Sequence, residues 1–191
     1  MKIAICVTGA SGAIYARRIL QLLSERDDCE AHLVVSANAP FVWESELGEP
    51  MPDTFGRVQR WDRHDFRAPF ASGSNPFDAV LVTPCSMSTL ARVAHGGGDD
   101  LTARACEVAL KERRKLVLMV RETPLSLVHL RNMTAATEAG AVILPAIPSF
   151  YAGVQTLDQA IDSVVGRVLD QAGIHVDLLP RWGSEDNGGG A

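Results

Sequence analysis

Lys2-Ile-Ala-Ile-Cys-Val-Thr-Gly-Ala-Ser-Gly12 is the stretch that decides the fold class of this 191-residue chain. After the lysine, the run as far as Val7 is apolar and partly β-branched, which predicts a short buried strand. The glycine turn that follows ends the strand, and apolar residues on one broad face predict a helix from Ser11 to about Arg26. A buried strand that turns tightly into an amphipathic helix is typical of α/β proteins.

The same alternation continues to the end of the sequence. We expect further apolar strands at 31–36, 78–84, 116–120 and 141–144, and helices at 38–47, 86–94, 100–113, 127–139 and 157–172. The segment 49–68, rich in Pro, Asp and Arg, is expected to be irregular. This pattern predicts a parallel sheet covered by helices on both faces. Its strand-to-helix loops then share the carboxyl edge of the sheet, where such folds place their sites.

Composition narrows the class of protein. With 47% hydrophobic residues the chain is globular, and we expect a single domain over residues 1–182 and a flexible tail at 183–191. The net charge of −5 argues against nucleic-acid binding. No stretch reaches the roughly 18 to 20 apolar residues of a membrane span, and the first apolar run is too short for a signal peptide. We therefore expect a cytoplasmic protein.

The four cysteines give no sign of a metal or a disulfide framework. They stand far apart, without a C-x-x-C pair or Cys/His ligand spacing, at positions 6, 29, 85 and 106. Cys6 and Cys85 lie in apolar runs and are expected to be small core residues.

The first loop at the predicted carboxyl edge is Thr8–Ala13. Its small residues let the backbone approach a ligand, and the N-terminus of the next helix suits a phosphate. The loop has G-x-x-G rather than G-x-G-x-x-G, and Ser36 stands where a ribose-binding acid would be expected. A nicotinamide cofactor is therefore disfavoured. A mononucleotide phosphate, a ribityl chain, or a turn that needs glycine for packing all remain open.

Two further loops carry polar residues to the same edge. Pro84-Cys-Ser-Met-Ser-Thr89 holds three hydroxyls that can cap a helix or bind ligand oxygens. Arg121 and Glu122 follow a fully apolar strand, where the arginine could grip a phosphate and the carboxylate could move a proton. A plain salt bridge between Arg121 and Glu122 is the alternative.

Basic and aromatic residues elsewhere are candidates for binding an anion or an apolar substrate. Arg104 and Lys111 share one helix face, although Glu107 between them also fits an ordinary ion-pair surface. The proline-rich aromatic segment 145–151 suits an apolar substrate. Arg167 lies among valines, either for a function or as an arginine that reaches out to solvent.

Several segments in combination resemble one known family, the UbiX flavin prenyltransferases. They are Thr8-Gly-Ala-Ser-Gly12, Ser36, Ala68-Pro-Phe-Ala-Ser-Gly-Ser74, Pro84-Cys-Ser86, Arg104–Arg113, Arg121-Glu122, His129-Leu-Arg-Asn-Met133, Gly140–Pro145 and Phe150-Tyr151. The similarity runs from about Ile3 to Trp182. It implies a Rossmann-like three-layer sandwich of flavoprotein type, built into a dodecamer of trimers with sites at subunit interfaces.

The resemblance also implies an activity. Dimethylallyl would pass from its monophosphate to N5 and then C6 of reduced FMN without a metal, and the prenylated FMN would serve a UbiD-type decarboxylase. The residues themselves also favour a reaction without a metal. Magnesium-dependent prenyltransferases bind diphosphate through clustered aspartates, and the only adjacent aspartate pair ahead of a helix here is Asp99-Asp100. Basic side chains suffice for a monophosphate.

Residue roles follow from the same motifs. Glu122 would exchange protons with the phosphate or the flavin, Ser11 would assist near N5, and Glu46 matches a further family acid. The residues implied to hold FMN are Gly9, Ala10, Ser11, Ser36, Ser86, Met87, Ser88, Thr89, Arg104 and Arg121. Those implied for the dimethylallyl substrate are Lys111, Arg121, Tyr151, Arg167, Phe66 and Ala71.

The sequence departs from the family pattern at three places. Phe66 stands where relatives often carry a tryptophan, Val120 replaces a common proline, and the loop His95–Asp100 is unusual. Two rival functions remain. One is a flavin-dependent cysteine decarboxylase, although Val-Arg-Glu-Thr-Pro-Leu-Ser126 stands in place of that family's P-x-M-N-x-x-M-W segment. The other is a non-catalytic flavin carrier subunit of a decarboxylase.

Overall fold

The computed structural model describes residues 1–183, and the rest of the expected tail, 184–191, lies outside the described residues. Six strands form one sheet in the order β3-β2-β1-β4-β5-β6, and all five strand pairings are parallel. The strands are β1 (Lys2–Val7), β2 (Glu30–Val35), β3 (Gln59–Trp61), β4 (Ala79–Cys85), β5 (Lys115–Val120) and β6 (Val142–Ile143). The predicted parallel α/β class is confirmed.

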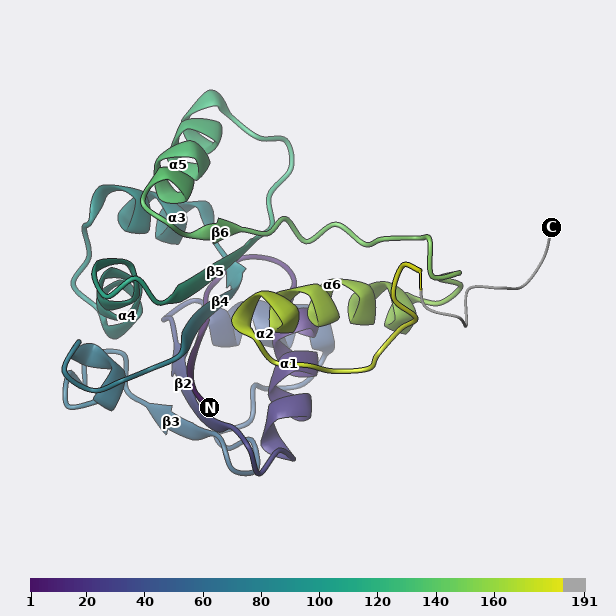
Figure 1. The fold of residues 1–191 in the computed structure, drawn as a ribbon, viewed down its shortest axis with the longest axis horizontal. Coiled ribbons are helices and arrows are strands. Elements are labelled where there is room, and N and C mark those ends of the chain that lie inside the picture. The colour runs from purple at the N-terminus through teal and green to yellow at the C-terminus, as the bar shows by residue number, and fades with distance from the viewer. Residues whose placement is uncertain (184–191) are drawn as a thin grey trace.

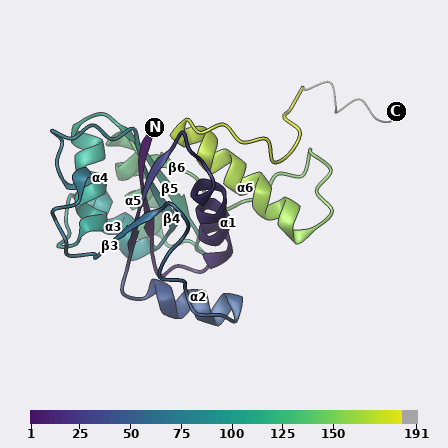
Figure 2. The ribbon, with the colours of Figure 1, turned by 90° about the horizontal axis from the view of Figure 1, so that it is seen from below.

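Helices cover both faces of this sheet, as Figures 1 and 2 show. One face carries α1 (Ala13–Ser24), α2 (Ala39–Leu47) and α6 (Leu157–Ala172). The other carries the short 3₁₀ turn η1 (Pro69–Ala71) and the helices α3 (Met87–His95), α4 (Leu101–Lys111) and α5 (Leu127–Glu138). The strand–helix alternation therefore gives the expected three-layer sandwich.

The alternation of side chains along β1 shows how the sheet divides the core. Ile3 and Ile5 pack with α1 and α6, whereas Ala4 and Cys6 pack toward α3 and α4. All four side chains are fully buried. This explains why the central strands read as continuous apolar runs rather than alternating ones.

The edges of the sheet differ most from the expectation. β3 lies inside the segment that was expected to be irregular. It was not predicted because two of its three side chains are exposed, which leaves almost no hydrophobic pattern. At the other edge β6 has two residues instead of the expected four. The helix ends agree within about two residues, and α1 begins at Ala13 because Gly12 takes a left-handed conformation (φ 116°).

No helix in residues 1–183 is long and apolar enough to cross a membrane.

Candidate active site

Thr8 joins the first two loops at the carboxyl edge. Its hydroxyl donates to the carbonyl oxygen of Pro84 at 2.6 Å and accepts from the backbone N–H of Ser86 at 2.9 Å. Both contacts are possible because β1 and β4 are neighbours in the sheet. The loops after these two strands are therefore held as one unit.

Glycine in the first loop has a packing reason. A Cβ on Gly9 would lie 2.7 Å from the Cβ of Asn38, closer than real Cβ atoms approach a neighbouring atom. The packing alternative raised for this turn therefore holds at Gly9. The loop is still open to solvent in part, since Gly9 and Ser11 are only half-buried.

Glu46 reaches from α2 to the start of α1. Its carboxylate accepts from the backbone N–H of Gly12 at 2.9 Å and of Ala13 at 2.8 Å. Partial burial acts to raise its pKa, but hydrogen bonds from Ser11, Gly12 and Ala13 and the charge of Arg121 hold the pKa below its ordinary value. The expectation that α1 offers free N–H groups to a phosphate is therefore wrong for these two amides, because a carboxylate from the same chain binds them.

The second loop opens α3. Ser86 is the N-cap, and its hydroxyl oxygen accepts from the N–H of Thr89 at 3.2 Å. The side chain of Thr89 is buried, with 2% of its surface exposed, whereas Ser88 is exposed and Ser86 and Met87 are half-buried. The capping interpretation is confirmed for Ser86. Thr89 is turned away from solvent, unlike Ser86, Met87 and Ser88 in the same loop.

Arg121 and Glu122 stand exposed where β5 ends, as expected. Within residues 1–183 no ion pair joins them, and Glu122 instead accepts from the N–H of Thr123 at 3.0 Å. The salt-bridge alternative is therefore not what the chain forms. Both residues line a cavity of about 390 Å³ with the surrounding residues Val120, Thr123, Leu125, Met133, Pro145, Ala146 and Ile147.

Tyr151 and Arg167 line a second cavity, of about 410 Å³. Pro145 and Ile147 line both this cavity and the first. Arg167 reaches out to solvent, the second of the two interpretations raised for it, because its side chain is 58% exposed and pairs with Asp170 at 3.6 Å. The valines around it point inward from the other side of α6.

Tyr151 has a neighbour that the sequence did not single out. Its ring meets the ring of Trp182 edge to face, with centroids 5.6 Å apart. Trp182 itself is 81% exposed. The available signal was a tryptophan beyond the last predicted helix, because aromatic rings favour edge-to-face pairs with one another.

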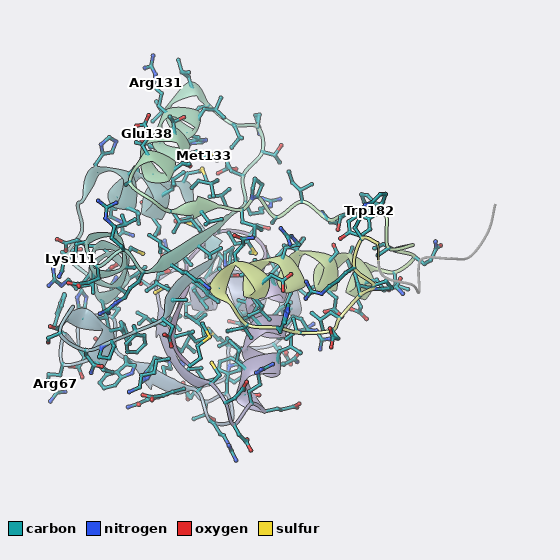
Figure 3. The ribbon with its side chains drawn as sticks, viewed as in Figure 1. Arg67, Lys111, Arg131, Met133, Glu138 and Trp182 are labelled. Atoms are coloured by element: carbon teal, nitrogen blue, oxygen red, sulfur yellow. The ribbon has the colours of Figure 1, made fainter. Side chains whose placement is uncertain are left out.

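Lys111 lies on the far side of the molecule from this pair. It ends α4 just before β5 begins, at the amino edge of the sheet, whereas Arg121 stands at the carboxyl edge. Six residues of β5 separate the two edges, a span of about 20 Å. Figure 3 shows Lys111 and Trp182 on opposite sides of the molecule. One chain alone does not bring Lys111 to Tyr151 and Arg167.

Arg104 lies on the α4 side as well. Its Nε donates to the carbonyl oxygen of Ala71 at 2.9 Å and its NH1 pairs with Glu107 at 2.9 Å. The ion-pair alternative holds for Arg104, while Lys111 pairs with Glu112 rather than Glu107. Ala71 is buried on η1, and Phe66 is half-exposed in the preceding loop.

The part of the chain that the structure describes brings no set of metal ligands together. Among residues 1–183 no group of three or more His, Cys, Asp or Glu side chains is placed to hold a metal ion. Asp100 caps α4 by accepting from the N–H of Ala103 at 2.9 Å and pairs with Arg92. Hydroxyls, a cation and an apolar cavity at one sheet edge are suited instead to an organic ligand that carries phosphate.

Comparison with known proteins places this geometry in a class. Residues 1–169 match the family model described as Flavoprotein, so the chain belongs to that family. The chain is also 45% identical over 185 residues to the flavin prenyltransferase UbiX of Methanocaldococcus jannaschii, covering 96% of this chain and all of the relative. Within the flavoproteins it therefore belongs to the UbiX-type flavin prenyltransferase family, and the resemblance is confirmed.

Two solved structures agree with this assignment. The crystal structure of AnUbiX (PadA1) in complex with FMN and dimethylallyl pyrophosphate superposes with a TM-score of 0.90 at 41% identity, covering 96% of this chain and 97% of that one. The dodecameric FMN-dependent UbiX-like decarboxylase of Escherichia coli O157:H7 gives a TM-score of 0.90 at 40% identity, with 96% and 100% covered.

Proposed function

We propose that this protein is a flavin prenyltransferase that transfers the dimethylallyl group of dimethylallyl monophosphate to reduced FMN. The observation that carries the proposal is that Arg121 and Glu122 form no ion pair with each other and both line a largely apolar cavity. A cation, a proton-transfer group and an apolar wall are what cleavage of an allylic phosphate requires. Membership of the UbiX-type family and the ligands of AnUbiX support the same reaction.

The chemistry balances without a metal. The allylic C–O bond breaks and releases inorganic phosphate as a C–N bond forms at N5, and the N5 proton is lost to the phosphate. The alkene of the attached group then takes up a proton at its inner carbon and bonds through its tertiary carbon to C6, which loses its own proton. Reduced FMN, the acceptor substrate, supplies the electron-rich N5 and C6. Glu122 would hold or move the proton that the phosphate or the flavin exchanges. Arg121, with Lys111, Tyr151 and Arg167, would bind the phosphate.

The proposed flavin contacts lie on the loops after β1, β2 and β4. They are Gly9, Ala10, Ser11, Ser36, Ser86, Met87 and Ser88, with Thr89 buried behind Ser86. Arg104 and Arg121 would complete the set. Glu46 holds Ser11 and the start of α1 by hydrogen bonds, which supports a role for both residues beside the flavin. Phe66 and Ala71 would contribute to the wall around the substrate.

The positions of the phosphate-binding candidates support a site shared between subunits. Lys111 lies on the opposite side of the chain from Trp182, the ring partner of Tyr151, so a site that contains Lys111 and Tyr151 needs a second chain. We place this site in a homododecamer, the assembly named for the Escherichia coli O157:H7 relative. Residues 1–182 would form its single domain. The enzyme would work in the cytoplasm and pass prenylated FMN to a UbiD-type decarboxylase.

One experiment tests the activity. The protein is incubated anaerobically with reduced FMN and dimethylallyl monophosphate, and the released flavin is examined by mass and absorption spectrum. The flavin should gain the mass of the prenyl group, and the diphosphate should serve less well. A flavin carrier would bind FMN and release it with its mass unchanged, which would refute the proposed activity. A cysteine decarboxylase would instead release carbon dioxide from a peptide with a C-terminal cysteine.

A further inference from the structure

Arg92 begins a chain of hydrogen bonds that ends at the proposed flavin site. Its NH1 pairs with Asp100 at 3.1 Å, and its NH2 donates to the hydroxyl oxygen of Thr89 at 3.4 Å. That oxygen lies 3.0 Å from the hydroxyl oxygen of Ser86. Three contacts therefore connect the buried start of α4 to the half-buried start of α3.

The hydrogen bonds from Arg92 to Thr89 and on to Ser86 can have only one donor-to-acceptor direction. A guanidinium has no acceptor, so the Thr89 oxygen must accept from Arg92. The Thr89 hydrogen is buried, and among residues 1–183 the acceptor recorded for it is the Ser86 oxygen. Leaving a buried hydroxyl hydrogen without an acceptor is costly, so Thr89 donates to Ser86.

This direction fixes what Ser86 can offer to a ligand. Its oxygen accepts from both the N–H and the hydroxyl of Thr89, which uses both lone pairs. The hydroxyl hydrogen of Ser86 is used in neither of these two hydrogen bonds and points away from Thr89. Ser86 is half-buried at the carboxyl edge, so this hydrogen is available to a bound molecule.

The surroundings hold Arg92 in place. Asp100 is buried, and its second oxygen caps α4. The glycine run packs against this pair, because a Cβ on Gly98 would lie 2.3 Å from the Cβ of Ala103 and 3.7 Å from Cδ of Arg92. Only glycine fits at position 98, whose φ of 144° adds to the requirement. The unusual loop His95–Asp100 therefore has a structural purpose in this chain.

We propose that Arg92 is a positioning residue that acts through Thr89 to make Ser86 a fixed hydrogen-bond donor to an acceptor oxygen of FMN. The inference rests on the proposed function in taking Ser86 as a flavin contact. The positive charge of Arg92 polarises the chain and strengthens the donation at its far end. Thr89 then contributes to binding from inside the protein, without touching the flavin.

A double-mutant cycle tests this coupling. FMN dissociation constants are measured by fluorescence quenching for the wild type, Arg92→Met, Ser86→Ala and the double variant. Arg92→Met should weaken FMN binding roughly 3- to 10-fold, in keeping with one lost hydrogen bond. In the Ser86→Ala background the same change should cost less than about 2-fold, since the two residues act as one unit.

Thr89→Val gives an independent route that leaves Arg92 and Asp100 paired. It should weaken FMN binding as much as Arg92→Met, and the two changes together should cost no more than either alone. If Arg92→Met does not fold, this variant with Ser86→Ala completes the cycle. Arg57→Met, which breaks an exposed pair with Asp27, and Thr137→Val, on α5, are matched controls that should leave FMN binding unchanged.

The outcomes separate this inference from the proposed function. A wild-type protein that does not bind FMN would refute the flavin site, and the inference would fall with it. Normal FMN binding with equal losses in both Ser86 backgrounds would show that Arg92 acts only on the fold, and the inference alone would fail. Binding unaffected by Arg92→Met and Thr89→Val would overturn it in the same way.

Discussion

Trp61 on the edge strand β3 donates its indole N–H to Nδ1 of His32 on β2, across 2.9 Å. Because Nδ1 accepts, the neutral ring carries its hydrogen on Nε2, which lies 3.0 Å from Glu30. Phe70 and Phe77 close the pocket around the ring, and Lys2 is the other charged group that acts on it. A buried neutral histidine thus fastens β3 to the sheet.

The pKa of His32 predicts an acid-sensitive edge. Burial lowers this pKa below its ordinary value of 6.5, although Glu30 acts to raise it. As the pH falls below 6.5, the unfolded chain takes up a proton before the folded one does, so folding stability falls. Denaturant unfolding from pH 7.5 to 5 should show this decline, and it should flatten in His32→Gln. An equal decline in that variant would contradict the assignment to His32.

Trp61→Phe tests the hydrogen bond itself. The ring packing is kept while the donor is lost, so we expect about 1 kcal/mol lower unfolding free energy at pH 7.5. His32 is then free to bind a proton at Nδ1, and the variant should depend less on pH than the wild type. Trp182→Phe, which changes an exposed ring far from β3, is the control for loss of an indole.

Glu46 predicts a second pH effect, at a lower pH. Its pKa is held below its ordinary value of 4.5, so its contribution is present above 4.5 and is lost as the pH falls through the folded-state pKa. Glu46→Gln should lower stability at pH 7 by about 1 kcal/mol, the usual effect of a helix cap. The difference between variant and wild type should shrink in acid. Glu44→Gln, on the same helix, should have no such effect, and equal behaviour of the two variants would refute the capping role.

Local signals explain what the sequence predicted well. The observed bounds of α6 equal the predicted 157–172, and the structure shows a local signal at each end: Thr156 and Gln159 form a capping box, and Gly173 takes a left-handed conformation. These signals lie within a few residues of the helix. The central strands are also easy to predict from their apolar runs. In β5, for example, the five residues after the first are all buried.

The parts that were missed depend on partners far along the chain. Glu46 binds amides more than thirty residues away, and no local pattern shows that α2 turns this carboxylate toward α1. The loop 84–89 was predicted either to cap a helix or to bind ligand oxygens, and its letters do not show that the helical turn after Ser86 places Thr89 inside. β3 is defined mainly by its pairing with β2, which its own three residues do not reveal.

The reaction itself is tested at Glu122. Glu122→Gln keeps the size of the side chain but removes proton transfer, so prenylation should slow by ~10²- to 10⁴-fold with FMN affinity little changed. Arg167→Ala should instead raise the KM for dimethylallyl monophosphate first, because it removes a phosphate contact. Single-turnover rates distinguish the two. A wild-type rate in Glu122→Gln would show that this carboxylate has no acid–base role.

The separation of Lys111 from Tyr151 predicts complementation between inactive chains. Lys111→Ala and Glu122→Gln should each be nearly inactive alone. If each site takes Lys111 from one subunit and Glu122 from another, co-expressed variants assemble some sites with both residues intact. Random mixing would restore up to roughly a quarter of the wild-type rate. Arg121→Met with Glu122→Gln is the matched control, because these neighbours come from the same chain and no mixed site can contain both. Restored activity in the control, or none in the test pair, would mean that Lys111 and Glu122 do not meet across a subunit boundary.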